Sequence, residues 1–143
     1  MYGVEINTEI APYDDLLFKI GYVYNHARNK SPERESTMVR NVPVYSYNLG
    51  AQYTVPVTGT KINLSMLYMG DSYSELPTPA DPGGDTIRNK RYQIANAKIT
   101  QLFLDDSLEA FISASNLFDE DYEPNSGQPA AGRKVWLGVS YKY

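Results

Sequence analysis

Residues 107–143 read SLEAFISASNLFDEDYEPNSGQPAAGRKVWLGVSYKY, and this stretch decides the predicted fold class. It contains an alternating segment, an Asn-Leu-Phe-Asp turn, a loop rich in Gly and Pro, and a second alternating segment with an aromatic end. In the last segment, every second position is apolar or aromatic: Val135, Leu137, Val139, Tyr141 and Tyr143. A period of two predicts a β-strand whose two faces meet different surroundings. About nine such residues, tilted, would cross the hydrocarbon layer of a bilayer, so we expect lipid on one face and water on the other.

The same alternation recurs along the rest of the chain. It is cleanest over residues 42–55, where aromatic and aliphatic side chains alternate with Ser, Asn, Gly, Gln and Thr. It is weaker over residues 91–103, where Ala95, Ala97 and Ile99 are assigned to the apolar face. No apolar run is long enough for a membrane-spanning helix, and no helix is expected. The predicted strands cover residues 3–11, 16–27, 42–55, 61–70, 91–103, 108–115 and 134–143.

Short and long connections alternate between these predicted strands. The short ones are turns built from Pro, Asp, Gly and Thr, and the long ones are polar loops, at residues 28–41, 71–89 and 117–132. This is the pattern of an antiparallel outer-membrane barrel, with short turns on the periplasmic side and long loops outside. A soluble β-sandwich spaces its strands similarly but has no reason to lengthen every second loop. The predicted fold is therefore all-β, an antiparallel transmembrane barrel wall.

The alternation also assigns each side chain to one face of the wall. A slip of one residue would turn every polar side chain toward lipid, so the pattern specifies the register. The side chains expected to face lipid are Leu16, Phe18, Ile20, Tyr45, Tyr47, Leu49, Ile62, Leu64, Met66, Leu137 and Val139. Those expected on the concave side, toward a plug or channel water, are Lys19, Ser46, Asn48, Gln52, Asn63, Asn96, Lys98 and Ser140.

The C-terminal stretch also carries a recognisable series of residues: Asn116, Leu117, Phe118, Asp119, Tyr122, Gly132, Arg133 and the terminal Tyr143. Upstream, Asn41-Val42-Pro43 precedes the string Tyr-Asn-Leu-Gly-Ala-Gln-Tyr at residues 47–53. Together these stretches resemble the C-terminus of TonB-dependent outer-membrane receptors, in which Phe is more usual at the last position. The resemblance extends over essentially the whole chain, but only over the C-terminal part of such a receptor.

This resemblance implies a function and a set of partners. It implies energy-coupled uptake of a scarce nutrient across the outer membrane of a Gram-negative bacterium, most often an iron–siderophore complex, with vitamin B12, haem and oligosaccharides as alternatives. The implied partners are outer-membrane lipid, the TonB system through a missing N-terminal part, and the barrel-assembly machinery, which would read Tyr143. The residue types favour a structural role for the motif: Asn116 and Asp119 are expected to close a turn, and Leu117 and Phe118 to anchor a strand end near the membrane interface.

Seven predicted strands are too few to close a barrel. Single-chain bacterial barrels have an even number of strands and at least about eight, and plugged transporters have about 22. An open sheet would expose unpaired edges, which lipid does not tolerate. The N-terminus lacks a signal-peptide pattern. We therefore expect residues 1–143 to be the C-terminal portion of a larger barrel, without its plug and N-terminal strands. Two alternatives stay open, a small independent outer-membrane barrel and a soluble tyrosine-rich β-domain that binds a ligand.

Composition excludes several other classes of function. The 143 residues include no cysteine and a single histidine, His26, so neither a disulfide framework nor a His- or Cys-based metal site is expected. The formal net charge of −4 argues against nucleic acid as a partner. Acidic pairs such as Asp14-Asp15 and Asp105-Asp106 fall in predicted turns, where Asp stabilises the turn and stays solvated. Catalysis would need carboxylates held in a cleft, so no enzyme activity and no cofactor are expected.

Two weaker binding hypotheses remain. The carboxylates of Asp119, Asp121 and Glu123 could supply oxygen ligands to calcium, although the full spacing of a calcium loop is missing. A second group, His26, Arg28 and Lys30, lies where the second predicted strand enters its long loop. Ferric siderophores are commonly anionic, so these basic residues could contribute to a substrate surface.

Overall fold

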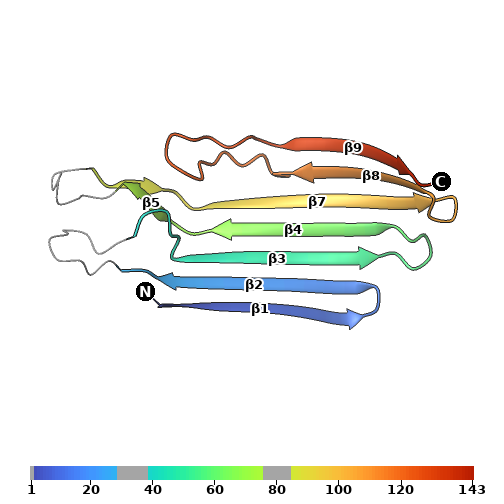
Figure 1. Ribbon diagram of the computed structural model, residues 1–143, viewed down its shortest axis with the longest axis horizontal. Coiled ribbons are helices and arrows are strands. Elements are labelled where there is room, and N and C mark those ends of the chain that lie inside the picture. The colour runs from blue at the N-terminus through green and yellow to red at the C-terminus, as the bar shows by residue number, and fades with distance from the viewer. Residues whose placement is uncertain (1, 29–38, 76–84) are drawn as a thin grey trace.

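The computed structural model describes residues 2–28, 39–75 and 85–143, and these residues form nine strands (Figure 1). Seven strands form one sheet, and the other two form a small separate hairpin. The sheet contains β1 (Tyr2–Tyr13), β2 (Leu16–His26), β3 (Tyr45–Thr54), β4 (Lys61–Met69), β7 (Tyr92–Phe103), β8 (Leu108–Ser115) and β9 (Lys134–Tyr141). The hairpin contains β5 (Ser72–Glu75) and β6 (Ile87–Asn89).

Within the seven-stranded sheet, each strand pairs antiparallel with the next strand of the sheet in chain order. This confirms the all-β fold and the seven predicted strands, whose ends shift by up to three residues. The predicted turn at residues 12–15 starts too early, because Pro12 still belongs to β1. The β1–β2 register shifts between Ile10 and Tyr13, and a proline is tolerated at such an irregularity on an edge strand.

The prediction of a structureless loop at residues 71–89 is wrong, because β5 and β6 lie inside it. These strands have four and three residues, too few for a period-two pattern to stand out among the surrounding Pro, Gly and Asp. The two strands pair antiparallel, with Ser72 opposite Asn89. The hairpin therefore extends the β4–β7 connection as an ordered element.

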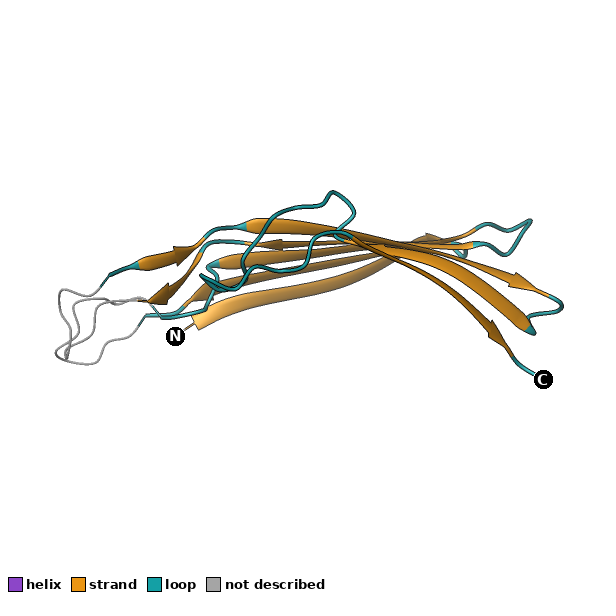
Figure 2. Cartoon of the chain, turned by 90° about the horizontal axis from the view of Figure 1, so that it is seen from above, coloured by secondary structure: helices purple, strands orange, loops and turns teal. Residues whose placement is uncertain are grey.

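The seven-stranded sheet is a single curved layer (Figure 2). The described residues include no helix that could span a bilayer. Among them Ile94 is the only buried hydrophobic residue. The outer strands β1 and β9 pair only with β2 and β8 within the described part of the chain. The described sheet is therefore not closed, and no second layer of the described residues covers it.

The strand register separates an apolar face from a polar face. Residues directly opposite one another on antiparallel neighbours share a face. One row across β2, β3, β4 and β7 is apolar: Ile20, Leu49, Met66 and Ala95. The adjacent row is polar: Lys19, Gly50, Ser65 and Asn96. The predicted alternation is thus confirmed, including the weakly patterned strand β7.

On the polar face, a glycine and a phenylalanine fit together between the last two strands. Gly138 lies opposite Phe111, whose ring occupies the space that a Cβ at Gly138 would need. The Nζ atom of Lys98 lies 4.4 Å from the centre of the same ring, which favours a cation–π interaction. This contact across β7, β8 and β9 helps to specify the register of the last strand.

The long and short connections lie at opposite ends of the sheet (Figure 1). The β2–β3 connection, the hairpin and the β8–β9 loop are at one end, and the short turns are at the other. The C-terminus lies at the end with the short turns. The predicted alternation of short and long connections is confirmed, and we refer to the end with the long connections as the loop end.

Candidate functional site

The loop end contains a cleft of about 630 Å³ between the β6–β7 junction and the β8–β9 loop. One wall carries three cationic side chains and the opposite wall three carboxylates. The first wall is formed by Arg88, Asn89, Lys90 and Arg91, and the second by Glu120, Asp121, Tyr122 and Glu123. Such a cleft offers both signs of charge to a polar ligand.

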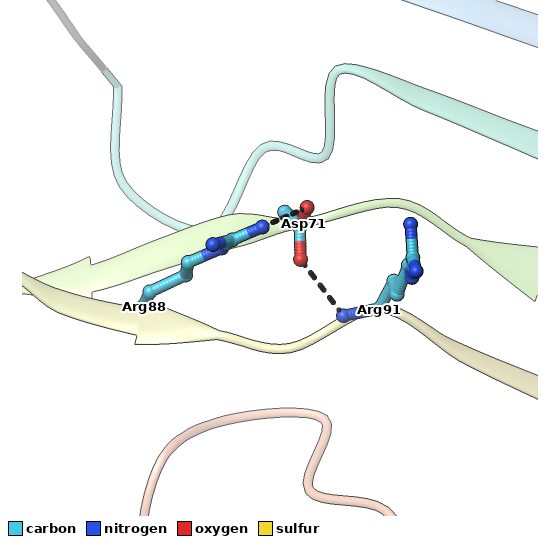
Figure 3. Close-up of polar contacts among 3 residues, drawn as sticks. All are labelled: Asp71, Arg88 and Arg91. Carbon is cyan, nitrogen blue, oxygen red and sulfur yellow. Dashed lines mark hydrogen bonds and ion pairs between the residues drawn. The ribbon is translucent and has the colours of Figure 1, made fainter.

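Asp71, between β4 and β5, holds the base of the cationic wall in place (Figure 3). Its Oδ2 atom lies 2.5 Å from Nη2 of Arg88, and its Oδ1 accepts a hydrogen bond of 3.0 Å from the backbone N–H of Arg91. The Arg88 guanidinium holds the pKa of Asp71 below its usual value, and Asp71 in turn raises the pKa of Arg88. Within the described part of the chain, no ion pair includes the side chain of Lys90 or Arg91.

Asn116 closes the start of the β8–β9 loop. It is only 3% exposed and has a φ of 49°, a left-handed conformation that Asn tolerates better than most residues. Its Oδ1 accepts the backbone N–H of Glu120 and its Nδ2 donates to the Glu120 carbonyl, both at 2.9 Å. The backbone N–H of Asn116 donates to Oδ1 of Asn96 on β7. The Asn116 side chain therefore closes the turn at Glu120, and its backbone N–H joins the turn to the sheet.

Asp119 joins the two ends of the same loop. Its Oδ1 accepts a 2.6 Å hydrogen bond from the backbone N–H of Arg133, which enters β9. A Cβ added at Gly132 would lie 2.8 Å from that oxygen, so glycine is needed for the approach. The ring of Tyr122 packs on Tyr92, with ring centres 4.5 Å apart. In this structure, the motif residues of the loop hold its backbone in place.

The remaining residues singled out in the sequence lie elsewhere. No group of three acidic, His or Cys side chains in the described part of the chain could hold a metal ion, so Asp119, Asp121 and Glu123 do not converge. The ring of His26 stacks on Tyr2 at 4.4 Å, and Arg28 is exposed just beyond β2. Neither of these side chains lines the cleft, and Lys30 lies outside the described residues.

The sequence analysis missed the residues that form the cationic wall. The signal available was the string Arg88-Asn89-Lys90-Arg91, three basic residues in four positions. This string did not predict a site, because it spans the junction between a predicted loop and a predicted strand. The tertiary structure places it opposite the acidic start of the β8–β9 loop.

Comparison with known proteins gives matches at the level of structure. No protein-family profile and no curated protein matches the chain. Among solved structures, it is similar to the ferric-catecholate import receptor Fiu from E. coli K12, with a TM-score of 0.78 and 21% identity over 96% of the chain. It is also similar to the siderophore receptor PiuA from Acinetobacter baumannii, with a TM-score of 0.74 and 18% identity over 99% of the chain.

A third similar structure is the ferripyoverdine receptor of the outer membrane of Pseudomonas aeruginosa, with a TM-score of 0.76 and 18% identity over 97% of the chain. The chain spans about a fifth of the length of these receptors: 20% of Fiu, 21% of PiuA and 19% of the ferripyoverdine receptor. The feature that these receptors share with this chain is the fold of the antiparallel sheet. The chain therefore has the fold of a segment of barrel wall from the outer-membrane siderophore receptors.

Proposed function

We propose that this chain forms the C-terminal part of the barrel of an outer-membrane receptor for TonB-coupled uptake of an iron–siderophore complex. The observation that carries the proposal is a sheet of receptor fold with one continuous apolar face and one polar face. Both faces are open to their surroundings in the described sheet, so each requires a partner. In this proposal, lipid of the outer membrane covers the apolar face, and a plug and channel water cover the polar face.

The exposure of the apolar face supports a lipid environment. Large apolar side chains stand exposed along it, among them Leu64, Leu137 and Val139. Contiguous exposed apolar surface of this kind marks a binding or membrane surface. Aromatic side chains cluster toward the loop end of this face, where Tyr47 contacts Tyr22, Tyr45 and Tyr68. Tyrosine is enriched at membrane–water interfaces because its ring is apolar and its hydroxyl is polar.

The open edges support a larger barrel over the two alternatives. The described sheet encloses no lumen, and β1 and β9 leave unpaired backbone groups on its edges. In hydrocarbon each such group carries a large cost, so further strands of the same barrel are needed to pair with them. A soluble β-domain would bury its apolar face against a second layer. The chain would contact TonB only through a part of the receptor outside residues 1–143.

The cleft at the loop end supports a polar, charged substrate. Its cationic wall presents Lys90 and Arg91, and charge-assisted hydrogen bonds from such groups recognise anionic oxygens. Ferric siderophores commonly carry negative charge, and the similar solved structures include receptors for ferric catecholate and ferripyoverdine. His26, the last residue of β2, and Arg28, just beyond it, would add to such a surface.

A transport assay in the source bacterium tests this function. Inactivating the gene should abolish uptake of radioactive iron from at least one ferric siderophore in a panel of catecholates, hydroxamates and pyoverdines under iron limitation. Restoring the full-length gene should recover uptake in a strain with TonB but not in a strain without it. The membrane fraction serves as the control that the protein is present in both strains.

Other outcomes of the same assay separate the alternatives. Outer-membrane protein with unchanged uptake of every siderophore, haem and vitamin B12 would indicate a barrel without a transport role. Protein that fractionates with the soluble contents without detergent would indicate a soluble binding domain. Lost growth on an oligosaccharide or haem, with normal siderophore uptake, would support a receptor function but show that its substrate is not a ferric siderophore.

The terminal aromatic residue gives a separate prediction about assembly. We expect deletion of Tyr143 from the full-length protein to reduce the amount of folded barrel in the outer membrane several-fold. Tyr143 follows the exposed aromatic and apolar side chains of Tyr141 and Val139, a series that the barrel-assembly machinery could bind. Heat-modifiability on gels measures the folded fraction, and Tyr143→Phe, which restores the more usual residue, is the matched control. Normal assembly of the deleted form would count against this role.

A further inference from the structure

Asn89 is one of the few buried polar residues of the described chain. It is the last residue of β6, it is 4% exposed, and it lines two hollows at once. One hollow is the 630 Å³ cleft, and the other is a small cavity of about 60 Å³ beside Gly70. A buried amide is stable only when its donor and acceptor atoms both have partners.

The two partners of the Asn89 amide come from two different connections of the loop end. Its Nδ2 donates to Oγ of Ser72 at 3.1 Å, across the base of the hairpin. Its Oδ1 accepts the backbone N–H of Ser126 at 2.8 Å, from the β8–β9 loop 37 positions away. The same side chain therefore closes the hairpin and holds the β8–β9 loop against it.

The contact at Ser126 also restrains other residues of the β8–β9 loop, because hydrogen bonds within the loop connect them. The N–H of Gly127 donates to Oε2 of Glu123, and the N–H of Ala130 donates to the carbonyl of Tyr122, both at 2.9 Å. Glu123 and Tyr122 belong to the acidic wall of the cleft. Holding Ser126 in place therefore also limits the movement of that wall.

A third connection is tied to the hairpin from its other side. The backbone N–H of Asn41, at the end of the β2–β3 connection, donates to the carbonyl of Tyr73 in β5 at 2.8 Å. Tyr73 neighbours Ser72, the hairpin partner of Asn89. These hydrogen bonds, with the peptide link between Ser72 and Tyr73, thus connect residue 41 through the hairpin to residue 126.

We propose that Asn89 is a positioning residue that joins the hairpin and the β8–β9 loop into one unit. The cationic and acidic walls of the cleft then keep a fixed separation before any ligand binds, which lowers the ordering cost of binding. The use of the cleft as a substrate surface rests on the proposed function, but the coupling of the two connections does not. Hydrogen exchange in the ligand-free protein therefore tests the coupling without depending on transport.

The test compares amide exchange in the full-length protein with and without Asn89→Ala. We expect the Ser126 amide to exchange about tenfold faster or more in the variant, because its acceptor is lost and the opening free energy of the loop falls. The amides of Gly127 and Ala130 should follow it if the loop opens as a unit. Amides in the middle of β3 and β4 should be unchanged, which shows that the barrel is folded.

Two further variants make the result specific. Asn89→Asp keeps the Oδ1 acceptor for Ser126, so protection of that amide should be largely retained. Asn125→Ala removes a neighbouring Asn whose side-chain hydrogen bond goes to Oε1 of Gln128, and it should leave Ser126 protected. If Asn89→Ala fails to fold, Ser72→Ala removes the other partner of Asn89 and should loosen the same loop.

Unchanged exchange at Ser126 in folded Asn89→Ala would overturn the proposal. Equal loss of protection in Asn89→Asp and Asn89→Ala would also overturn it, because the acceptor atom would then not matter. Faster exchange at Ser126 with normal siderophore uptake would retain the coupling and show that this cleft does not bind the substrate. Lost uptake with normal exchange at Ser126 would contradict the coupling and indicate that Asn89 affects uptake without holding the β8–β9 loop.

Discussion

Leu64→Arg should leave little folded receptor in the outer membrane. Leu64 lies near the middle of β4, opposite Ala51 on one neighbour and Ala97 on the other, and is 50% exposed on the apolar face. A guanidinium at the bilayer midplane of a barrel costs about 2–4 kcal/mol. A typical domain is stable by only about 5–15 kcal/mol, so this single change removes a large share of the stability. The loss is measured as the heat-modifiable fraction in membranes and as the urea midpoint after refolding into lipid vesicles.

The matched control for this prediction is the adjacent residue. Ser65 lies on the polar face, opposite Gly50 and Asn96, where an arginine would extend into water. Ser65→Arg removes one exposed hydrogen bond, from Nδ2 of Asn96, but buries no charge in lipid. The two variants therefore differ in the face that receives the charge. Equal assembly of both variants would show that the apolar face does not contact hydrocarbon.

The sheet itself is predictable from the sequence because every second residue of each strand has to be apolar. In the single-layer wall between lipid and water that we propose, one face of every strand must be apolar and the other polar, so each strand repeats the alternation independently of the others. The face on which Leu49 or Asn48 lies can therefore be predicted from its own strand, without knowing which strands lie beside it. The alternation of turn and loop lengths follows from the same geometry, since consecutive strands cross the layer in opposite directions.

The hairpin and the cleft are less predictable because their stability comes from contacts between segments that are distant in the sequence. In the sequence, Asn89 cannot be distinguished from an ordinary loop asparagine, because its partner Ser126 is 37 positions away. That Arg91 and Glu120 line the same cleft likewise depends on how two connections, distant in the sequence, meet at the loop end. No local period marks such pairs. Propensity alone assigns Asn and Asp to turns without identifying which backbone group each one binds.

The motif at the start of the β8–β9 loop lies between these two cases. Its composition predicts a turn, since Asn and Asp accept left-handed backbone and bind nearby amides. What the sequence cannot supply is the partner at the far end of the loop. Asp119 binds the backbone of Arg133, and Gly132 leaves room for that contact. Glycine is therefore needed at position 132, because it lies against the carboxylate of Asp119.

Asn116→Ala should destabilise the folded barrel by about 2–4 kcal/mol, the largest effect expected from any uncharged substitution in the loop. The alanine loses both part-buried hydrogen bonds to the backbone of Glu120. It must also hold a φ of 49°, which costs a Cβ-bearing residue without local hydrogen bonds about 1–2 kcal/mol. Urea unfolding of the full-length protein in lipid vesicles measures the change.

Asn116→Gly separates the two parts of this effect. Glycine adopts the left-handed conformation without strain but makes neither side-chain hydrogen bond, so it should be destabilised less than the alanine variant by up to about 1 kcal/mol. Asn125→Ala, in the same loop, removes an asparagine that contacts only Gln128 through its side chain and should leave the midpoint nearly unchanged. A parent-like midpoint for Asn116→Ala would mean that the turn does not depend on this side chain. The two side-chain hydrogen bonds to Glu120 would then contribute little to the stability of the loop.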